Sequence, residues 1–413
     1  MQTRKMIWAA LALLGSAWIA PGAMAAKTQE TVYYTTAHGN NNTYLARWTS
    51  ASKARVTTQV GTSKGSLVIA GNDRTVTLDD PFTQVYVGFP DSCGNQYTVE
   101  RSVEQVLFRL TSGTLGQGES VIIDIGRETV MDGCDAGTET PFGSPTDTGT
   151  PQANLSMNQR PSLTDLVAGV RLAGPQEARM LAGVPFPAQQ IVTFQAGGLL
   201  SFDDTGRTVP AAVNAEGWLV LDFGTHQTGY TRVARDTATM AETWLQADFV
   251  DGAPALVQER LFVKPKAPAG FGSKRETTRR WESGLFVDTN SPFFFELYGD
   301  FSGARVSVTL DPPSEVRQPI TWAFSGANVT TTRVAGGLQR VRTWVPLANK
   351  GANRWVMESE VTINADGSQT PFIDPRVNFY IDRGPAVKPP SAVAAAPAAR
   401  PSAALQRASS LLP

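Results

Sequence analysis

Short runs of apolar and β-branched residues recur along the first 130 residues, each bounded by Gly, Asp, Asn or Pro. The opening pair, TVYYTTA and TYLARWT, is separated by HGNNN, which supplies residues suited to the positive φ of a hairpin turn. Similar runs predict six more strands, at residues 66–70, 75–78, 84–88, 96–100, 105–110 and 120–125. Regular short strands with frequent turns favour an antiparallel sandwich or barrel over a parallel sheet.

These patterns predict an all-β protein of two or three antiparallel sandwich or barrel domains with one short helix. The helix is expected over residues 175–183, which begin with proline and end with glycine. The segment DAGTETPFGSPTDTGT is so poor in large apolar side chains that burial cannot offset its ordering cost. We therefore expect an N-terminal β domain over residues 26–134, followed by a linker or exposed loop over 135–160.

Two stretches of the C-terminal half, residues 200–263 and 296–361, share an ordered series of residues. The series includes Trp218 with Trp322, TRVA at 231–234 with TRVA at 332–335, and Trp244 with Trp344. A single shared tetrapeptide is expected by chance in a chain of this length, so the common order is the informative part. Two alternatives stay open: coincidence, or a duplicated β unit with copies over residues 161–275 and 276–383.

Six of the seven tryptophans after residue 25 lie between Trp218 and Trp355. Paired large side chains are typical of a filled barrel or sandwich interior, and exposed indoles that stack on a flat ligand are the alternative. The candidate ligand-binding residues are Trp218, Trp244, Trp322 and Trp344. The turn, the Trp-led strand and the hairpin of this half resemble lipocalin-type barrels in fold, which implies a barrel but no particular activity.

The N-terminus has the three-part pattern of a secretory signal peptide over residues 1–25. Arg4 and Lys5 precede the apolar run MIWAALALLGSAWIA, and the small-residue sequence AMA follows it. The run is shorter than the roughly 20 residues of a spanning helix, and no later stretch predicts a transmembrane segment. We expect a secreted or periplasmic protein. Loss of the two cations moves the formal charge from −1 to −3, which gives no electrostatic footprint for nucleic acid.

Cys93 and Cys134 are the only cysteines, and in an exported chain they predict one structural disulfide. With only two histidines, His38 and His226, they are too few for a four-ligand Cys/His zinc site, so we expect no metal and no cofactor. Residues 384–413 are rich in Ala, Pro and Ser and contain no acidic or aromatic side chain, which predicts a disordered tail.

The sequence offers few catalytic candidates, and the catalytic residues of any enzyme here are unknown. GTSKG at residues 61–65 matches a hydrolase nucleophile elbow, but strand-like sequence follows it, which favours a Gly-rich hairpin turn. Asp203 and Asp204 suit a turn in FDDTG. Glu358 and Glu360 share one strand face, and we interpret that face as solvated rather than catalytic.

The leading hypothesis is an exported, non-catalytic binding or structural protein of the cell envelope or extracellular space. Its partner would be a protein, a glycan or a small apolar ligand. Two alternatives remain: a secreted carboxylate-dependent hydrolase of a polysaccharide or other polymer, and a barrel-type carrier of a small apolar molecule, whose cavity the four candidate tryptophans would line. The segment SPFFFELYGDF suggests a surface that contacts a partner, because at least one of its three adjacent rings must face away from the core.

Overall fold

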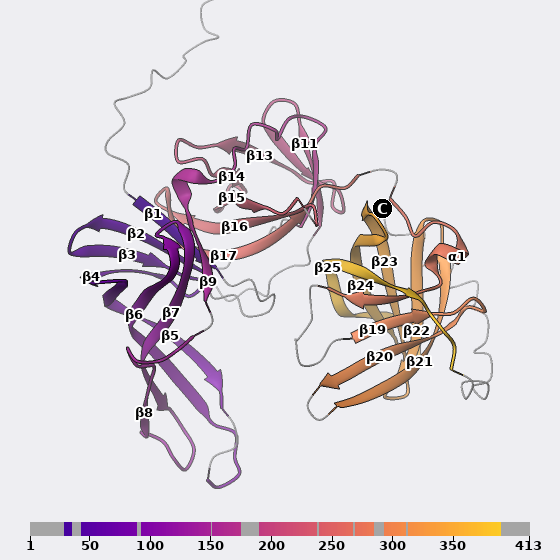
Figure 1. The fold of residues 1–413 in the computed structure, drawn as a ribbon, viewed down its shortest axis with the longest axis horizontal. Helices are drawn as coiled ribbons and strands as arrows, with labels where there is room; N and C mark the ends of the chain where they lie inside the picture. Colours follow the sequence, from indigo (N-terminus) through magenta and orange to yellow (C-terminus); the bar gives the residue numbers. More distant parts are fainter. Residues whose placement is uncertain are drawn as a thin grey trace, which may run out of the picture.

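The computed structural model describes residues 29–34, 43–88, 92–149, 151–174, 190–237, 239–266, 269–284, 293–310 and 313–389. In these residues the protein is almost entirely β-structure, arranged as three successive units (Figure 1). The expected all-β fold of several domains is confirmed. The expected signal peptide, the helix expected over 175–183, His38 and most of the tail lie outside the described residues. Within them, no helix is long and apolar enough to cross a membrane.

The N-terminal unit is an antiparallel sheet that closes on itself. β1 pairs with β2 and β9, β9 pairs with β7, and β7 pairs with β6, so every strand of the sheet except β8 belongs to one ring. The pairing of β1 with β2 confirms the expected opening hairpin. We call the ring the N-terminal barrel. The strands of the whole sheet are β1 Gln29–Tyr34, β2 Tyr44–Ser50, β3 Lys53–Thr57, β4 Thr62–Ala70, β5 Asp73–Val87, β6 Thr98–Thr114, β7 Gln117–Val130, β8 Glu139–Phe142 and β9 Gln152–Ser156.

The expected linker at residues 135–160 differs from the structure, because it contains β8, β9 and the 3-10 turn η1 (Met157–Gln159). β9 follows the segment of low apolar content, and pairing on both sides satisfies the backbone groups of this short strand. The buried amide of Asn154 accepts a hydrogen bond from Gly116 N at 2.6 Å and donates one to Ser120 Oγ at 2.9 Å. β9 is therefore the strand that closes the barrel.

Two further closed barrels follow, each an eight-stranded meander whose first and last strands pair. The middle barrel comprises β10 Arg171–Ala173, β11 Ile191–Gln195, β12 Leu199–Phe202, β13 Thr208–Val213, β14 Leu219–Asp222, β15 Gln227–Arg235, β16 Ala241–Val250 and β17 Ala253–Val263. The C-terminal barrel comprises β18 Arg279–Ser283, β19 Phe293–Leu297, β20 Ser302–Leu310, β21 Pro313–Ser325, β22 Asn328–Ala335, β23 Leu338–Lys350, β24 Asn353–Ile363 and β25 Gln369–Pro385, and the short helix α1 (Lys274–Thr277) precedes it.

Each of these two barrels is closed at one end by the segment that precedes its first strand. In the middle barrel, Asp165 of that segment pairs with Nη1 of the buried Arg232 at 3.1 Å. In the C-terminal barrel, Phe271 stacks on Trp344 with 5.6 Å between the ring centroids, next to α1. The segment before the middle barrel thus contributes the buried Leu163 and an ion pair from Asp165, and the segment before the C-terminal barrel contributes an aromatic ring.

The ordered series of residues shared by 200–263 and 296–361 falls on different strands of the two barrels. TRVA lies on β15, the sixth strand of the middle barrel, but on β22, the fifth strand of the C-terminal barrel. Trp244 and Trp344 show the same displacement, on β16 and β23. The two barrels share a topology, yet the matched residues do not occupy equivalent strands.

The three adjacent phenylalanines of β19 divide between the two faces of the strand, as the sequence required. Phe295 is buried in the interior of the C-terminal barrel. Phe294 points to the other face, where the guanidinium of Arg280 lies 4.1 Å from its ring centroid. The pleat of the strand produces this division.

The middle barrel contacts both of its neighbours. On the N-terminal side, an apolar cluster joins Leu45 of β2 to Leu245 and Val257 of the middle barrel. On the C-terminal side, Val263 packs with residues of β24 and β25, and Trp355 Nε1 donates a hydrogen bond to the carbonyl oxygen of Thr239. Apolar contacts and hydrogen bonds thus link the units at both junctions.

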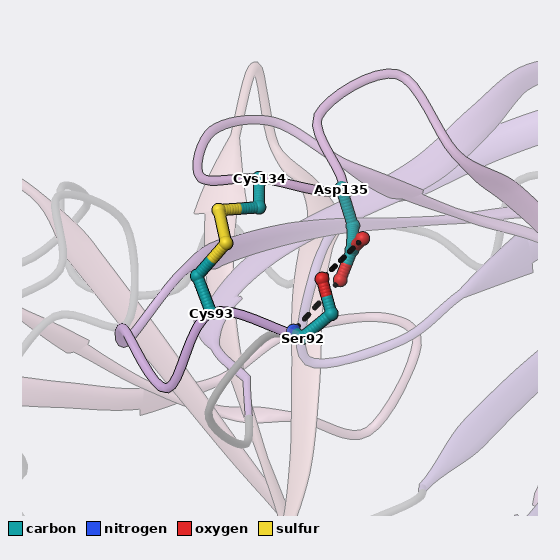
Figure 2. Close-up of a disulfide and its surroundings, with 4 residues drawn as sticks. All are labelled: Ser92, Cys93, Cys134 and Asp135. Carbon is teal, nitrogen blue, oxygen red and sulfur yellow. Dashed lines mark hydrogen bonds between the residues drawn. A yellow bond between two sulfur atoms is a disulfide. The ribbon is translucent and has the colours of Figure 1, made fainter.

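The long strands β5, β6 and β7 extend beyond the N-terminal barrel and carry β8 at their far end (Figure 1). The predicted disulfide is confirmed: Cys93 and Cys134 are bonded at this end, joining the β5–β6 loop to the β7–β8 turn (Figure 2). Beside it, Ser92 donates hydrogen bonds from its N and Oγ to the carboxylate of Asp135, at 3.1 and 3.0 Å. The disulfide therefore joins the ends of these strands covalently, at a place that lies beyond the barrel core.

Candidate functional site

A polar cavity of about 160 Å³ opens into the N-terminal barrel, close to β17 of the middle barrel. Barrel mouths and domain junctions are preferred places for ligand sites, and this cavity has both features. Its lining combines hydroxyl, amide, guanidinium and carboxyl groups with a few apolar side chains. These residues are Thr43, Tyr44, Thr58, Gln59, Val60, Phe82, Gln84, Arg101, Val103 and Asp124.

Strand alternation places Asp124 in this cavity. Its neighbours on β7, Ile123 and Ile125, pack in an apolar cluster on the outer face of the sheet. Ile122 packs instead against the interior cluster of the barrel. Because successive side chains point to opposite faces, Asp124 shares the inward direction of Ile122. A carboxyl group therefore occupies an inward-facing position of β7, where the alternation of the strand predicts an apolar residue.

One carboxylate oxygen of Asp124 has a hydrogen-bond partner among the described residues, and the other has none. Tyr44 OH donates a hydrogen bond to Asp124 Oδ2 at 2.7 Å. Oδ1 is buried and has no hydrogen-bond partner among the described residues. Burial raises the pKa of Asp124, although the Tyr44 hydrogen bond and the charge of Arg101 oppose the shift. An unsatisfied buried acceptor is costly, so this oxygen is available to a donor group that enters the cavity.

Arg101 brings a fixed positive charge to the same cavity. Its Nη1 donates a hydrogen bond to Glu128 Oε1 at 2.8 Å, and its guanidinium lies 3.6 Å from the ring centroid of Phe142 on β8. These two contacts hold the guanidinium in place. The cavity therefore combines an open acceptor with a nearby cation that is already paired.

The wall of the cavity is tied to the middle barrel. Glu259 N donates to Thr43 Oγ1 at 3.1 Å, and Val257 N donates to the carbonyl oxygen of Thr58 at 2.9 Å. Both acceptor residues line the cavity. Burial also raises the pKa of Glu259 to about 8, so this junction carries a carboxyl group that is largely protonated at neutral pH. Movement at the junction would alter the shape of the cavity.

The structure distributes the four candidate tryptophans over three packed clusters. Trp244 lies in the interior of the middle barrel, and Trp322 and Trp344 lie in that of the C-terminal barrel. Trp218 packs with Phe249 at the junction with the N-terminal barrel. All four indoles are buried, and they do not meet at one surface. Their role in ligand binding stays a prediction.

The interpretation of Glu358 and Glu360 as a solvated face is wrong. Both carboxylates point into the C-terminal barrel and are almost fully buried, at 0 and 1 % exposure. Burial alone would raise the pKa of Glu358, but Arg342 and Arg376 hold it below its usual value. The short-range pattern could not show this, because the partner arginines come from neighbouring strands of a closed barrel.

Two smaller assignments have different outcomes. Asp203 and Asp204 lie in the turn after β12, as expected from FDDTG. GTSKG at residues 61–65 is not a turn, because β4 begins at Thr62 and runs through it. His226 stacks on Phe223 in the β14–β15 turn, with 4.8 Å between the ring centroids.

No family model, curated protein or solved structure matches this chain. Within the ranges that the structure describes, no group of three or more His, Cys, Asp or Glu side chains is placed to hold a metal ion. The function must therefore be argued from the site itself. Sequence reasoning missed Asp124, and the available signal was a single acid inside the apolar run VIIDI.

Proposed function

We propose that this chain is an exported, non-catalytic binding protein whose N-terminal barrel holds the end of a neutral, hydroxyl-rich molecule such as a glycan. The observation that carries the proposal is the free, buried Oδ1 of Asp124 inside a polar cavity of about 160 Å³. The signal-peptide pattern of the sequence and the Cys93–Cys134 bond support export, because disulfides persist in oxidising compartments.

The charges around the cavity favour a neutral ligand over a cation. Asp124 Oδ1 accepts a hydrogen bond, and a hydroxyl group can donate one without bringing charge. A cationic ligand would meet Arg101 in the same lining. The amides of Gln59 and Gln84 add donors and acceptors, and Phe82 offers an apolar surface for the C–H face of a sugar ring. Few polar groups around an apolar surface are typical of small-molecule sites.

The volume limits what enters the cavity. A cavity of about 150 Å³ in another protein accommodates benzene, so this one has room for about one six-membered ring. A longer glycan would leave its remaining sugars outside the barrel. The cavity is therefore proposed to bind the terminal sugar unit of a glycan or a single sugar.

The two alternative functions receive less support from the site. Hydrolysis of a glycosidic bond by the usual mechanism needs two carboxyl groups facing each other, and the described lining contains only Asp124. Glu358 and Glu360 are both bound by arginines in another barrel. An apolar carrier needs an apolar cavity, whereas most of the side chains around Asp124 are polar.

Isothermal titration calorimetry with glucose, galactose and N-acetylglucosamine tests the proposal. We expect saturable binding of at least one sugar to the wild-type protein. Asp124→Asn places an amide where the ligand needs an acceptor, so it should abolish binding while Tyr44 keeps its partner. Asp79→Asn, an exposed acid on the same barrel, should leave binding unchanged. No saturable heat with any sugar, or equal loss in both variants, would contradict the proposed function.

A further inference from the structure

One end of the C-terminal barrel interior carries more positive than negative charge. Strand register places five arginines at this end, facing inward together with two glutamates. Each side chain shares a face with an interior residue: the arginines of β23, for example, alternate with residues on the outer face and precede the buried Trp344 by two and four positions. The set is Arg305, Arg333, Arg340, Arg342, Arg376, Glu358 and Glu360.

Three of the arginines already occupy both carboxylates. Glu360 accepts hydrogen bonds from Arg333 Nη2 at 2.6 Å and from Arg342 Nε at 2.7 Å. Glu358 accepts one from Arg376 Nε at 2.7 Å and another from Tyr380 OH at 2.6 Å. These contacts, with a longer one from Arg342 Nη1 to Glu358 Oε2 at 3.4 Å, involve all four carboxylate oxygens.

Arg305 and Arg340 make no hydrogen bond or ion pair to any described residue, and the Nε atom of each is buried without a partner. Each guanidinium does lie near a ring: Arg340 is 3.5 Å from the centroid of Phe372, and Arg305 is 5.4 Å from that of Phe293. Burial lowers the pKa of Arg305, and the charges of Arg333 and Arg342 lower it further. Arg340 stands directly opposite Arg333 in the pairing of β22 with β23. The two unpaired guanidinium groups therefore lie on either side of Arg333, in a region of mutual repulsion.

The other end of the barrel is filled. Phe271 contacts Trp281 and Trp344, and Trp281 Nε1 donates a hydrogen bond to the carbonyl oxygen of Thr277 in α1 at 3.1 Å. These groups belong to the segment before β18 and to the barrel core. A charged molecule that enters the barrel must therefore approach from the arginine end.

We propose that this end of the C-terminal barrel is a second binding site, which takes a phosphate group. A guanidinium presents a planar fork of N–H donors that matches the oxygens of phosphate, and ionised partners make the strongest hydrogen bonds. One dianion supplies the two negative charges that Arg305 and Arg340 lack. This site lies in a different barrel from the sugar cavity, so either proposal can fail without the other.

Calorimetry with inorganic phosphate, at ionic strength held constant with sodium chloride, tests the site. We expect one saturable site per chain. Arg305→Gln and Arg340→Gln should each weaken binding at least tenfold. Arg275→Gln removes an exposed arginine before the other end of the barrel and should bind as the wild type does. Neither site variant removes a protein hydrogen bond, and near-ultraviolet circular dichroism and the melting temperature establish that both have folded.

A parallel titration with glycerol 3-phosphate distinguishes a free ion from the phosphate group of a larger molecule. Tighter binding of the ester assigns the site to a phosphate-bearing organic molecule, and tighter binding of inorganic phosphate assigns it to the free ion. Either result supports the proposal. Absence of saturable binding of both, or equal weakening in Arg275→Gln, would overturn it.

Discussion

The middle and C-terminal barrels share a meander of eight strands but differ in the balance of charge inside them. The middle barrel buries Arg232 and Arg260 with the acids Glu242 and Asp248. Arg232 Nε donates to Glu242 Oε2 at 2.9 Å, and the same oxygen accepts a hydrogen bond from Trp244 Nε1 at 3.0 Å. The C-terminal barrel has five inward arginines at one end and two acids. The same topology therefore houses a neutralised core in one case and a cationic end in the other.

This difference separates a structural role from a binding role. A buried charge with a partner contributes to one fixed packing, and removing the partner is expensive. A charge without a partner costs stability in the free protein and is compensated when a ligand supplies the missing charge. On this basis, the paired charges of the middle barrel are those of a structural core, and the unpaired charges of the C-terminal barrel are those that the proposed phosphate site requires.

The largest effect is expected when a paired core loses its acid. Glu358→Gln leaves Arg342 and Arg376 facing each other without their shared carboxylate, and we expect a loss of about 3–5 kcal/mol in the free energy of unfolding. Glu242→Gln should cost a similar amount in the middle barrel. Urea denaturation measures both. A loss below about 1 kcal/mol in either variant would show that these ion pairs do not stabilise the cores.

The pH dependence of stability should reveal the buried carboxyl group of Glu259 on the outer face of β17. Its folded pKa of about 8 lies above its ordinary value, so the protonated form stabilises the fold. Stability should fall as the pH rises from about 4.5 to about 8. Glu259→Gln removes this loss and should be more stable than the wild type by about 1–3 kcal/mol at pH 9, with no difference near pH 4. Urea denaturation across this range provides the check, and a difference that does not change with pH would argue against the assignment.

Asp165 tests the ion pairs that the segment before β10 makes with the middle barrel. Arg232 and Lys264 hold the pKa of Asp165 below its usual range, against the effect of burial, which alone would raise it. The carboxylate therefore stabilises the fold above about pH 4, and this contribution is lost as the pH falls further. Because Asp165 is partly exposed, Asp165→Asn should cost only about 1–2 kcal/mol at pH 7, and this cost should shrink steadily as the pH falls below about 4. A cost that is the same at every pH would indicate a packing effect instead.

The smallest effect on stability is expected for Arg305→Gln. The same substitution at Arg232 in the middle barrel gives the direct comparison. Arg305→Gln removes an unpaired charge and should change stability by less than about 1 kcal/mol, with stabilisation the expected direction. Arg232→Gln removes the buried partner of Glu242, which keeps only the more exposed Arg235 and Lys264, and should destabilise by several times as much. Thermal melts of the two variants compare them directly. Equal losses would contradict the distinction between the two barrels.

The sequence allowed much of the local structure to be predicted, because the signals were local. The opening hairpin, the turn at Asp203 and the Cys93–Cys134 bond all follow from short patterns, and the structure contains them. The closure of the N-terminal barrel by β9 depends on pairing with β1 and β7, which lie far from β9 in sequence. No local signal reports such a contact.

The candidate sites were harder to predict for the same reason. The alternation of Glu358 and Glu360 predicts a solvated face. Only the pairing of β24 with β23, which carries Arg342, shows that the two acids have a buried partner. Asp124 depends on Tyr44, which is 80 residues away. Burial of a charged group is a property of the closed barrel and not of the strand that carries the group.

Side-chain nuclear magnetic resonance of the arginines tests the central distinction most directly. In a phosphate titration at constant ionic strength, we expect the Nε–H signals of Arg305 and Arg340, assigned from the Gln variants, to shift together and saturate. The Arg232 signal, whose Nε–H is bound by Glu242, should stay in place. If the Arg305 and Arg340 signals do not move, or if all three drift in parallel without saturation, the C-terminal barrel is no more a binding site than the middle one.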